Sequence, residues 1–247
     1  MDIQPGTLYL VSTPIGNLED ITLRALSVLK QVDLVAAEDT RHTRELLAHF
    51  DIRTRLVSCH AFNEHARVGE LLDELRAGRS VAAVSDAGTP SIADPGYCLV
   101  RAAVDAGFAP VVIPGVSALT FAATASALPV DKFAFYAFPP VKSGRRKQFF
   151  ERIAAEDKTV FFYESVHRIA KTLNELAEYL GPDTPVALIR EATKLHEEVR
   201  RGTASEFAAN PGTLKGEFVI GVGRPRTPEG SEQRDEGSLA EGEGKTF

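Results

Sequence analysis

The chain has 247 residues, a length that suits one large domain or two small ones. Its 44% hydrophobic and 25% charged residues are typical of a soluble globular protein, and no apolar run approaches the roughly 20 residues that span a membrane, so we expect a cytoplasmic protein. The net charge of −6 argues against broad electrostatic binding of nucleic acid, and two cysteines are too few for a disulfide framework or a thiolate metal cluster.

The first half of the chain alternates apolar strand patterns with amphipathic helix patterns. This alternation predicts a parallel βαβ domain over residues 1–116. The predicted strands are Thr7–Val11, Asp33–Ala37, Arg55–Cys59, Val81–Ser85 and Pro110–Ile113, and the clearest predicted helices are Ile21–Gln31, Thr43–Phe50 and Glu64–Ala77.

The second half has a similar alternation and predicts a second α/β domain over residues 117–225. The expected helices are Ser117–Ala127, Lys142–Ala155 and His167–Leu180, after which we expect no further helix. The expected strands are Phe133–Phe138, Thr159–Tyr163, Pro185–Arg190 and finally Glu198–Gly202 and Glu217–Val222, which we expect to pair with each other. The fold class is therefore α/β: two α/β domains with mostly parallel sheets and a cleft between them.

The end of the chain differs in composition from the rest. Residues 226–247 are Gly-rich, nearly free of apolar residues and carry six acidic and three basic residues. We expect a disordered acidic tail.

Three loops at predicted strand ends carry more turn and polar residues than a plain connection needs. They are Ser12–Asp20, Val84–Gly96 and Ile113–Leu119. Ligands of open α/β sheets bind at the carboxyl ends of strands, so these loops predict a small-molecule site. The alternatives are a helix capped near Asp20 for the first loop and a plain hinge between domains for the third.

Two further polar segments have both a functional and a structural interpretation. Residues 38–42 place two acids, Arg41 and His42 after a buried strand; they indicate proton transfer and phosphate binding, or a helix capped by Asp39 or Thr40. The basic run 142–147 indicates either an RNA-binding cleft wall or a solvated helix face. No HExxH motif is present, and we expect no metal.

Six segments of the chain resemble the signature blocks of the small-subunit ribosomal RNA 2′-O-methyltransferases of the tetrapyrrole methylase superfamily. They read TPIGNLEDIT, AAEDTRHT, VSDAGTPSIADPG, YESVHR, EATKLHEE and KGEF, in order between about Thr7 and Val222. The resemblance implies a class III methyltransferase fold, S-adenosylmethionine bound in the interdomain cleft, a homodimer, and methylation of a cytidine ribose in the decoding region of 16S rRNA within the small ribosomal subunit. The chain departs from the family pattern at Val116, Val166 and Ala192.

Carried over by motif, the resemblance also implies a set of donor-binding residues. They are Pro14, Ile15, Gly16, Ser85, Asp86, Ala87, Gly88, Ser117, Ala118 and Tyr163.

Transfer of a methyl group to a ribose hydroxyl also requires a proton acceptor. The candidates are Glu38, Asp39, His42, Glu64, Glu164 and His196, of which we favour Glu38, Asp39 and His42. The residues expected to contact RNA phosphates are Arg41, Arg145, Arg146, Arg168 and Lys194. The alternatives are a methyltransferase acting on a small molecule such as a tetrapyrrole and a non-catalytic donor-binding protein.

Overall fold

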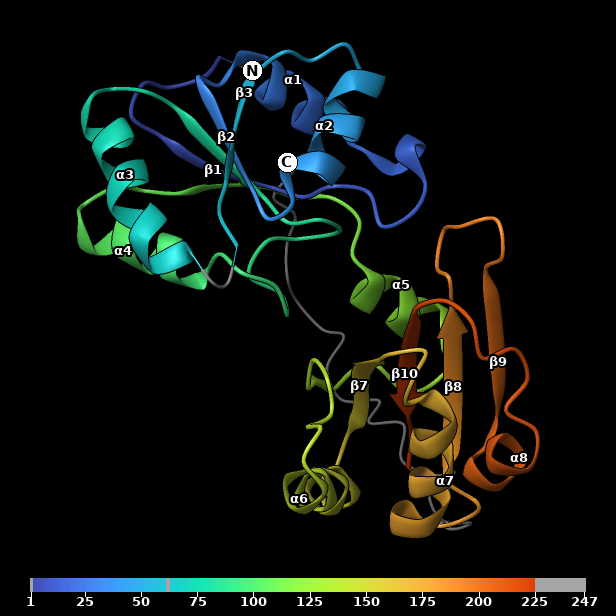
Figure 1. Ribbon diagram of the computed structural model, residues 1–247. Coiled ribbons are helices and arrows are strands. Elements are labelled where there is room, and N and C mark those ends of the chain that lie inside the picture. The colour runs from blue at the N-terminus through green and yellow to red at the C-terminus, as the bar shows by residue number, and fades with distance from the viewer. Residues whose placement is uncertain (1, 61–62, 225–247) are drawn as a thin grey trace, which may run out of the picture.

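The computed structural model describes residues 2–60 and 63–224, which form two α/β units, each built on a five-stranded sheet (Figure 1). This two-sheet architecture confirms the predicted fold class. The predicted acidic tail, residues 226–247, lies outside the described residues. No helix in the described part of the chain is long and apolar enough to cross a membrane.

The first sheet is entirely parallel, in the order β3-β2-β4-β1-β5. Its strands are β1 (Leu8–Val11), β2 (Leu34–Ala37), β3 (Arg55–Ser58), β4 (Val81–Val84) and β5 (Val111–Ile113). Every residue of β1, β2 and β4 is buried, as expected for strands covered by helices on both faces.

Alternation along β1 divides the core of this unit into two layers. Tyr9 and Val11 pack with α1 (Leu23–Gln31) and α2 (Thr40–His49), whereas Leu8 and Leu10 pack with α3 (Glu64–Arg76) and α4 (Tyr97–Asp105). Successive strand residues point to opposite faces, so one strand supplies both layers.

The segment between β1 and α1 corrects one expectation. Asp20 ends the short 3₁₀ helix η1 (Leu18–Asp20) and does not cap α1. The cap is Thr22, whose hydroxyl accepts a hydrogen bond of 3.0 Å from the Ala25 amide. Threonine and aspartate are both good N-cap residues, so composition alone did not separate them.

The second sheet has the order β6-β7-β10-β8-β9. Its strands are β6 (Phe133–Phe135), β7 (Thr159–Glu164), β8 (Pro185–Arg190), β9 (Glu198–Thr203) and β10 (Phe218–Val222). Helix α5 (Ala118–Ala125) packs on one face, and α6 (Ser143–Ala154), α7 (Ile169–Leu180) and α8 (Ala204–Ala209) pack on the other.

Three details of the second unit differ from the prediction. Five of the eight strand pairings among the described residues are parallel, but in this sheet only β6–β7 is. Strands β9 and β10 do not pair with each other; both pair with β8. A further helix, α8, follows β9, and Thr203 and Glu206 form its capping box, a spacing visible in the sequence.

The chain passes from the first sheet to the second through residues 114–117. Strand β5 ends at Ile113, and α5, which begins at Ala118, already packs against β7 and β10 of the second sheet. The amino-terminal end of α5 therefore lies at the junction of the two units (Figure 1).

Candidate functional site

Loops at the carboxyl ends of β1, β4 and β5 are hydrogen-bonded to one another. Thr13 and Gly88 exchange backbone hydrogen bonds of 2.9 and 3.1 Å. The Ser12 amide donates to the Ile113 carbonyl at 3.1 Å, and the Ser12 hydroxyl lies 3.0 Å from that of Thr89. The three loops that the sequence singles out therefore form one connected floor.

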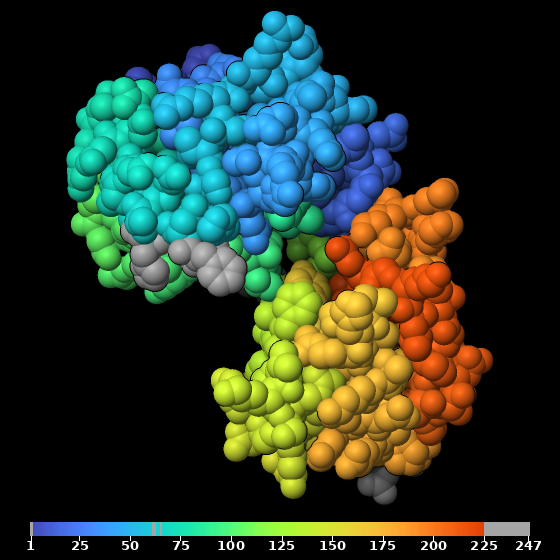
Figure 2. All heavy atoms as spheres, in the orientation of Figure 1, coloured from blue at the N-terminus to red at the C-terminus, as the bar shows by residue number. Residues whose placement is uncertain are grey.

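This floor faces an open cleft of about 480 Å³ between the two units. Figure 2 shows the hollow between the blue-green first unit and the yellow-green and orange second unit. Residues from both units line the cleft, among them Ile15, Glu38, Asp86, Gly88, Asp94, Ser117, Tyr163, Ala192 and Glu217. The cleft lies at the carboxyl edge of a parallel sheet, where ligands of such sheets bind.

Two acidic residues, Glu38 after β2 and Asp86 after β4, each accept a hydrogen bond from a backbone amide of the other loop. The Asp86 amide donates to the Glu38 carboxylate at 3.4 Å, and the Asp86 carboxylate accepts from the Asp39 amide at 2.9 Å. Burial, followed by the negative charge of Asp86, raises the pKa of Glu38. Both carboxylates line the cleft.

Asp94 is another carboxylate of the cleft, and the sequence analysis did not single it out. Burial, and then the charges of Glu38 and Asp86, raise the pKa of Asp94 to about 6. Its loop is tightly shaped, because Ser91 and Ala93 have φ values of 72° and 65°, which non-glycine residues seldom adopt. The clue in the sequence was a second acid, after Asp86, in one Gly/Pro-rich strand-end loop.

Glu64 anchors the far end of the same loop. Its carboxylate accepts hydrogen bonds from the amides of Gly96, Cys98 and Leu99, at 3.0, 3.1 and 3.3 Å, at the start of α4. A buried carboxylate held by three amides at a helix amino terminus is a structural cap. The interpretation of Glu64 as a proton acceptor is therefore wrong.

Strand β7 carries different chemistry on its two faces. Val160, Phe162 and Glu164 face the layer formed by α6 and α7, whereas Phe161 and Tyr163 face α5 and the cleft. Burial raises the pKa of Tyr163 to about 12, so its hydroxyl stays protonated and can donate a hydrogen bond.

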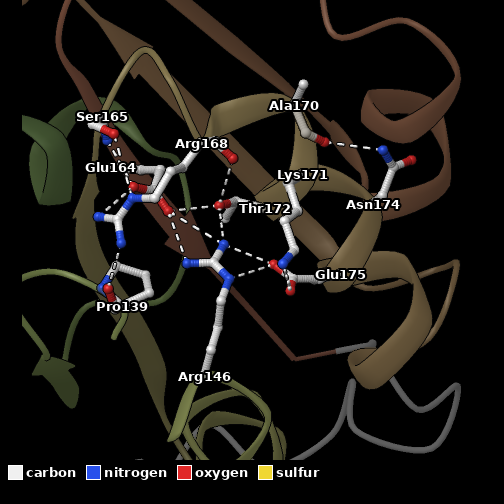
Figure 3. Close-up of polar contacts among 10 residues, drawn as sticks. All are labelled: Pro139, Arg146, Glu164, Ser165, Arg168, Ala170, Lys171, Thr172, Asn174 and Glu175. Carbon is white, nitrogen blue, oxygen red and sulfur yellow. Dashed lines mark hydrogen bonds and ion pairs between the residues drawn. The ribbon is translucent and has the colours of Figure 1, made fainter. Parts of the chain in front are cut away.

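The buried face of β7 holds an ion-pair network, shown in Figure 3. Glu164 lies 3.4 Å from the guanidinium of Arg146 and 2.8 Å from that of Arg168. Arg146 also pairs with Glu175 at 2.7 Å and donates to the Thr172 hydroxyl, which donates to Glu164 at 2.6 Å. Two arginines and two glutamates thereby join α6, β7 and α7.

This network corrects two predictions. Arg146 is only 2% exposed and fully engaged with acids, so it cannot contact an RNA phosphate. The side chain of Glu164 has no exposed surface and pairs with two arginines, so it is no proton acceptor.

The other residues predicted to bind phosphate differ in availability. Arg168 is mostly buried and donates to the Pro139 carbonyl at 2.8 Å, and Lys194 pairs with Glu191 and Glu217 at 3.0 and 2.9 Å. Arg41 is 84% exposed but pairs with Asp39 at 2.7 Å, whereas Arg145 is exposed on α6. Arg41 and Arg145 are thus the most accessible of the predicted set.

Of the ten residues expected to hold the donor, seven line the cleft: Ile15, Asp86, Ala87, Gly88, Ser117, Ala118 and Tyr163. The other three, Pro14, Gly16 and Ser85, are their chain neighbours. Gly16 lies against the second unit: a β-carbon added to it would collide with the side chain of Lys194. No three His, Cys, Asp or Glu side chains of residues 2–60 and 63–224 are placed to hold a metal ion.

The favoured proton acceptors are not all brought to the cleft. Glu38 lines it, but Asp39 and His42 do not. Asp39 is the N-cap of α2, and hydrogen bonds from the Arg41 side chain and amide lower its pKa, which makes it a weak base. His42 and His196 are exposed outside the lining.

Comparison with known proteins agrees with the fold. The tetrapyrrole (corrin/porphyrin) methylase family matches residues 7–208. The ribosomal RNA small subunit methyltransferase I of Halalkalibacterium halodurans is 48% identical over 217 residues, which cover 87% of this chain and 75% of the relative.

Solved structures of methyltransferases share this fold. The uroporphyrin-III C-methyltransferase of Thermus thermophilus is 26% identical, with a TM-score of 0.64, over 89% of this chain and 94% of the other. A uroporphyrin-III C-methyltransferase of Thermus thermophilus complexed with S-adenosylhomocysteine is 23% identical, with a TM-score of 0.62, over 88% of this chain and 97% of the other.

A fold of two α/β units around a cleft at the strand ends thus defines a methyltransferase of the class that the sequence resembles. The chain belongs to the tetrapyrrole methylase family.

Proposed function

We propose that this protein transfers a methyl group from S-adenosylmethionine to the 2′-hydroxyl of a cytidine in the decoding region of 16S rRNA. The observation that carries the proposal is the cleft shared by both units, with Glu38, Asp86 and Asp94 on its wall. The 48% identical relative from Halalkalibacterium halodurans, named for methylation of small-subunit ribosomal RNA, supports the choice of acceptor.

S-adenosylmethionine, the methyl donor, matches the charge of the cleft. Its sulfonium and amino groups are cationic, and the residues that line the cavity include Glu38, Asp86, Asp94 and Glu217. Ser117 and the amides at the start of α5 suit the donor's carboxylate, while Gly88 and Ala118 leave room for its flat adenine.

The acceptor hydroxyl must lose a proton as the methyl group arrives. Glu38 and Asp94 are the carboxylates in the cleft with raised pKa values, which makes both better bases than an ordinary carboxylate. We assign proton acceptance to this pair. Positioning of the donor and the hydroxyl supplies the rest of the acceleration.

The decisive experiment is methyl transfer from radiolabelled S-adenosylmethionine to small ribosomal subunits from a strain that lacks the enzyme. We expect the label in 2′-O-methylcytidine after nuclease digestion, and none with subunits from the parent strain, which are already methylated. Label in a base or a protein would contradict the proposal. Transfer to uroporphyrinogen III with none to subunits would favour the small-molecule alternative.

The resemblance also supports a cytoplasmic homodimer acting on the assembled small subunit. Analytical ultracentrifugation tests the dimer. Parallel assays with free 16S rRNA and assembled subunits test the form of the acceptor.

A further inference from the structure

Three large apolar side chains at the lip of the cleft remain exposed to solvent. They are Ile92, Phe138 and Val166, with 42%, 50% and 36% of their surfaces exposed, and all three line the cleft. They come from three separate loops, after β4, before α6 and after β7. Exposed apolar surface gathered at one rim is typical of a surface that binds a partner.

The ring of Phe138 is held in a fixed position by its surroundings. Its centroid lies 5.4 Å from that of Tyr163, with the ring planes at 62°. The carbonyl of the next residue, Pro139, accepts a hydrogen bond of 2.8 Å from Arg168. The preceding residue, Ala137, has a φ of 45° and its carbonyl accepts from the Tyr163 amide at 2.6 Å. Arg168 is therefore a positioning residue for this loop.

Cations with no acidic partner follow this aromatic residue along the chain. Lys142 and Arg145 are exposed at the start of α6 and form no ion pair with any described residue. The yellow-green segment that contains them forms one side of the hollow in Figure 2. An exposed aromatic side chain, followed along the chain by exposed cations at the start of the next helix, matches the base and phosphates of a single-stranded polynucleotide.

We propose that Ile92, Phe138 and Val166 form a binding site for one unpaired nucleobase, with Phe138 as its stacking platform and Lys142 and Arg145 holding adjoining phosphates. The inference rests on the proposed function, since the ribose of that nucleotide is the methyl acceptor. A base paired within a duplex cannot reach a platform at the lip of a cleft, so the acceptor nucleotide must be extruded or single-stranded.

The test is direct binding of a fluorescently labelled, short single-stranded oligoribonucleotide, measured by anisotropy at saturating S-adenosylhomocysteine. We expect Phe138→Ala to lose roughly 5- to 100-fold in RNA affinity, the effect of one stacked base, and Phe138→Tyr to retain it. The matched control is Val141→Ala, because Val141 is 80% exposed on the same loop but does not line the cleft. We expect it to bind RNA like the wild type.

Affinity for S-adenosylhomocysteine, measured by calorimetry, shows whether each variant remains folded around its donor site. Wild-type RNA affinity in Phe138→Ala, or a duplex that competes as well as the single strand, would overturn the inference. Phe138-dependent RNA binding without methyl transfer to subunits would leave the inference standing and contradict the proposed function. Methyl transfer to subunits that is unaffected by Phe138→Ala would support the proposed function and contradict this inference.

Discussion

The side chain of Lys194 in the second unit lies against Gly16 in the first, so closely that Gly16 has no room for a β-carbon. Lys194 cannot easily move aside, because it is paired with Glu191 and Glu217 at 3.0 and 2.9 Å. The contact joins the loop after β1 to the loop between β8 and β9, on either side of the cleft.

We expect Gly16→Ala to weaken binding of S-adenosylhomocysteine roughly 10-fold, because about 1–3 kcal/mol of overpacking strain falls beside the donor pocket. Isothermal titration calorimetry measures the change. The control is Gly69→Ala in α3, where an added β-carbon meets nothing within 4 Å. Equal affinities in the two variants would show that the contact does not shape the donor pocket.

The neighbouring residues Arg145 and Arg146 should behave as opposites. Arg146→Leu removes an ion-pair partner from both Glu164 and Glu175, whose negative charges are buried. We therefore expect a loss of about 3 kcal/mol in the free energy of unfolding. Arg145→Leu should change this free energy by less than about 0.5 kcal/mol and weaken RNA binding instead. Urea denaturation and RNA anisotropy separate the two, and similar destabilisation by both variants would contradict the buried network.

Asp94 should make both activity and stability depend on pH. Its carboxyl has a pKa of about 6 in the folded protein against an ordinary 3.8, so the folded state binds its proton more tightly than the unfolded state does. Its contribution to stability is therefore greatest below pH 3.8 and is lost as pH rises towards and through 6. We expect Asp94→Asn, which carries no charge, to raise the Tm at pH 7 relative to the wild type.

The same group should set the pH profile of the reaction. We expect the rate of methyl transfer to rise as pH increases through about 6, and Asp94→Asn to lose roughly 100-fold or more in kcat without this rise. Single-turnover rates of methyl transfer by the wild type and Asp94→Asn, measured from pH 5 to 8, test this prediction. An unchanged profile in Asp94→Asn would assign proton acceptance to Glu38 alone.

Glu64 should matter for stability and not for catalysis. Glu64→Gln weakens three hydrogen bonds at the start of α4, and we expect a loss of about 1–2 kcal/mol in the free energy of unfolding. We expect kcat, measured well below the Tm, to be retained. Glu70→Gln, an exposed acid on the same helix, serves as the control, and a large fall in kcat for Glu64→Gln alone would restore Glu64 as a candidate base.

The first unit could be predicted closely because β1, β2 and β4 are continuous buried runs and amphipathic helices separate its strands. The direction of the later strands was less apparent, although the connection between Arg190 and Glu198 is too short for a parallel crossover and implies a hairpin. Pairing of Phe218–Val222 between β7 and β8 depends on packing between segments far apart in sequence, which a local pattern does not contain.

The site was predictable where chemistry follows a strand directly, as at Glu38 and Asp86. Arg146 was misassigned because it lies in a basic run, yet its spacing from Phe149, Phe150 and Ile153 places it on the buried face of α6. The role of Asp94 depends on burial, on the charges of Glu38 and Asp86 and on the left-handed turns at Ser91 and Ala93, so its own sequence position did not reveal it.

The alternation along β7 limits how this strand can change over evolutionary time. One residue added or removed between Val160 and Glu164 would rotate the rest of the strand by half a turn, exchanging Tyr163 and Glu164 between the cleft and the interior. A carboxylate would then replace a neutral hydroxyl in the cleft, and Arg146 would lose one of its two acidic partners. A change in the length of β7 would therefore cost the protein both its stability and its site.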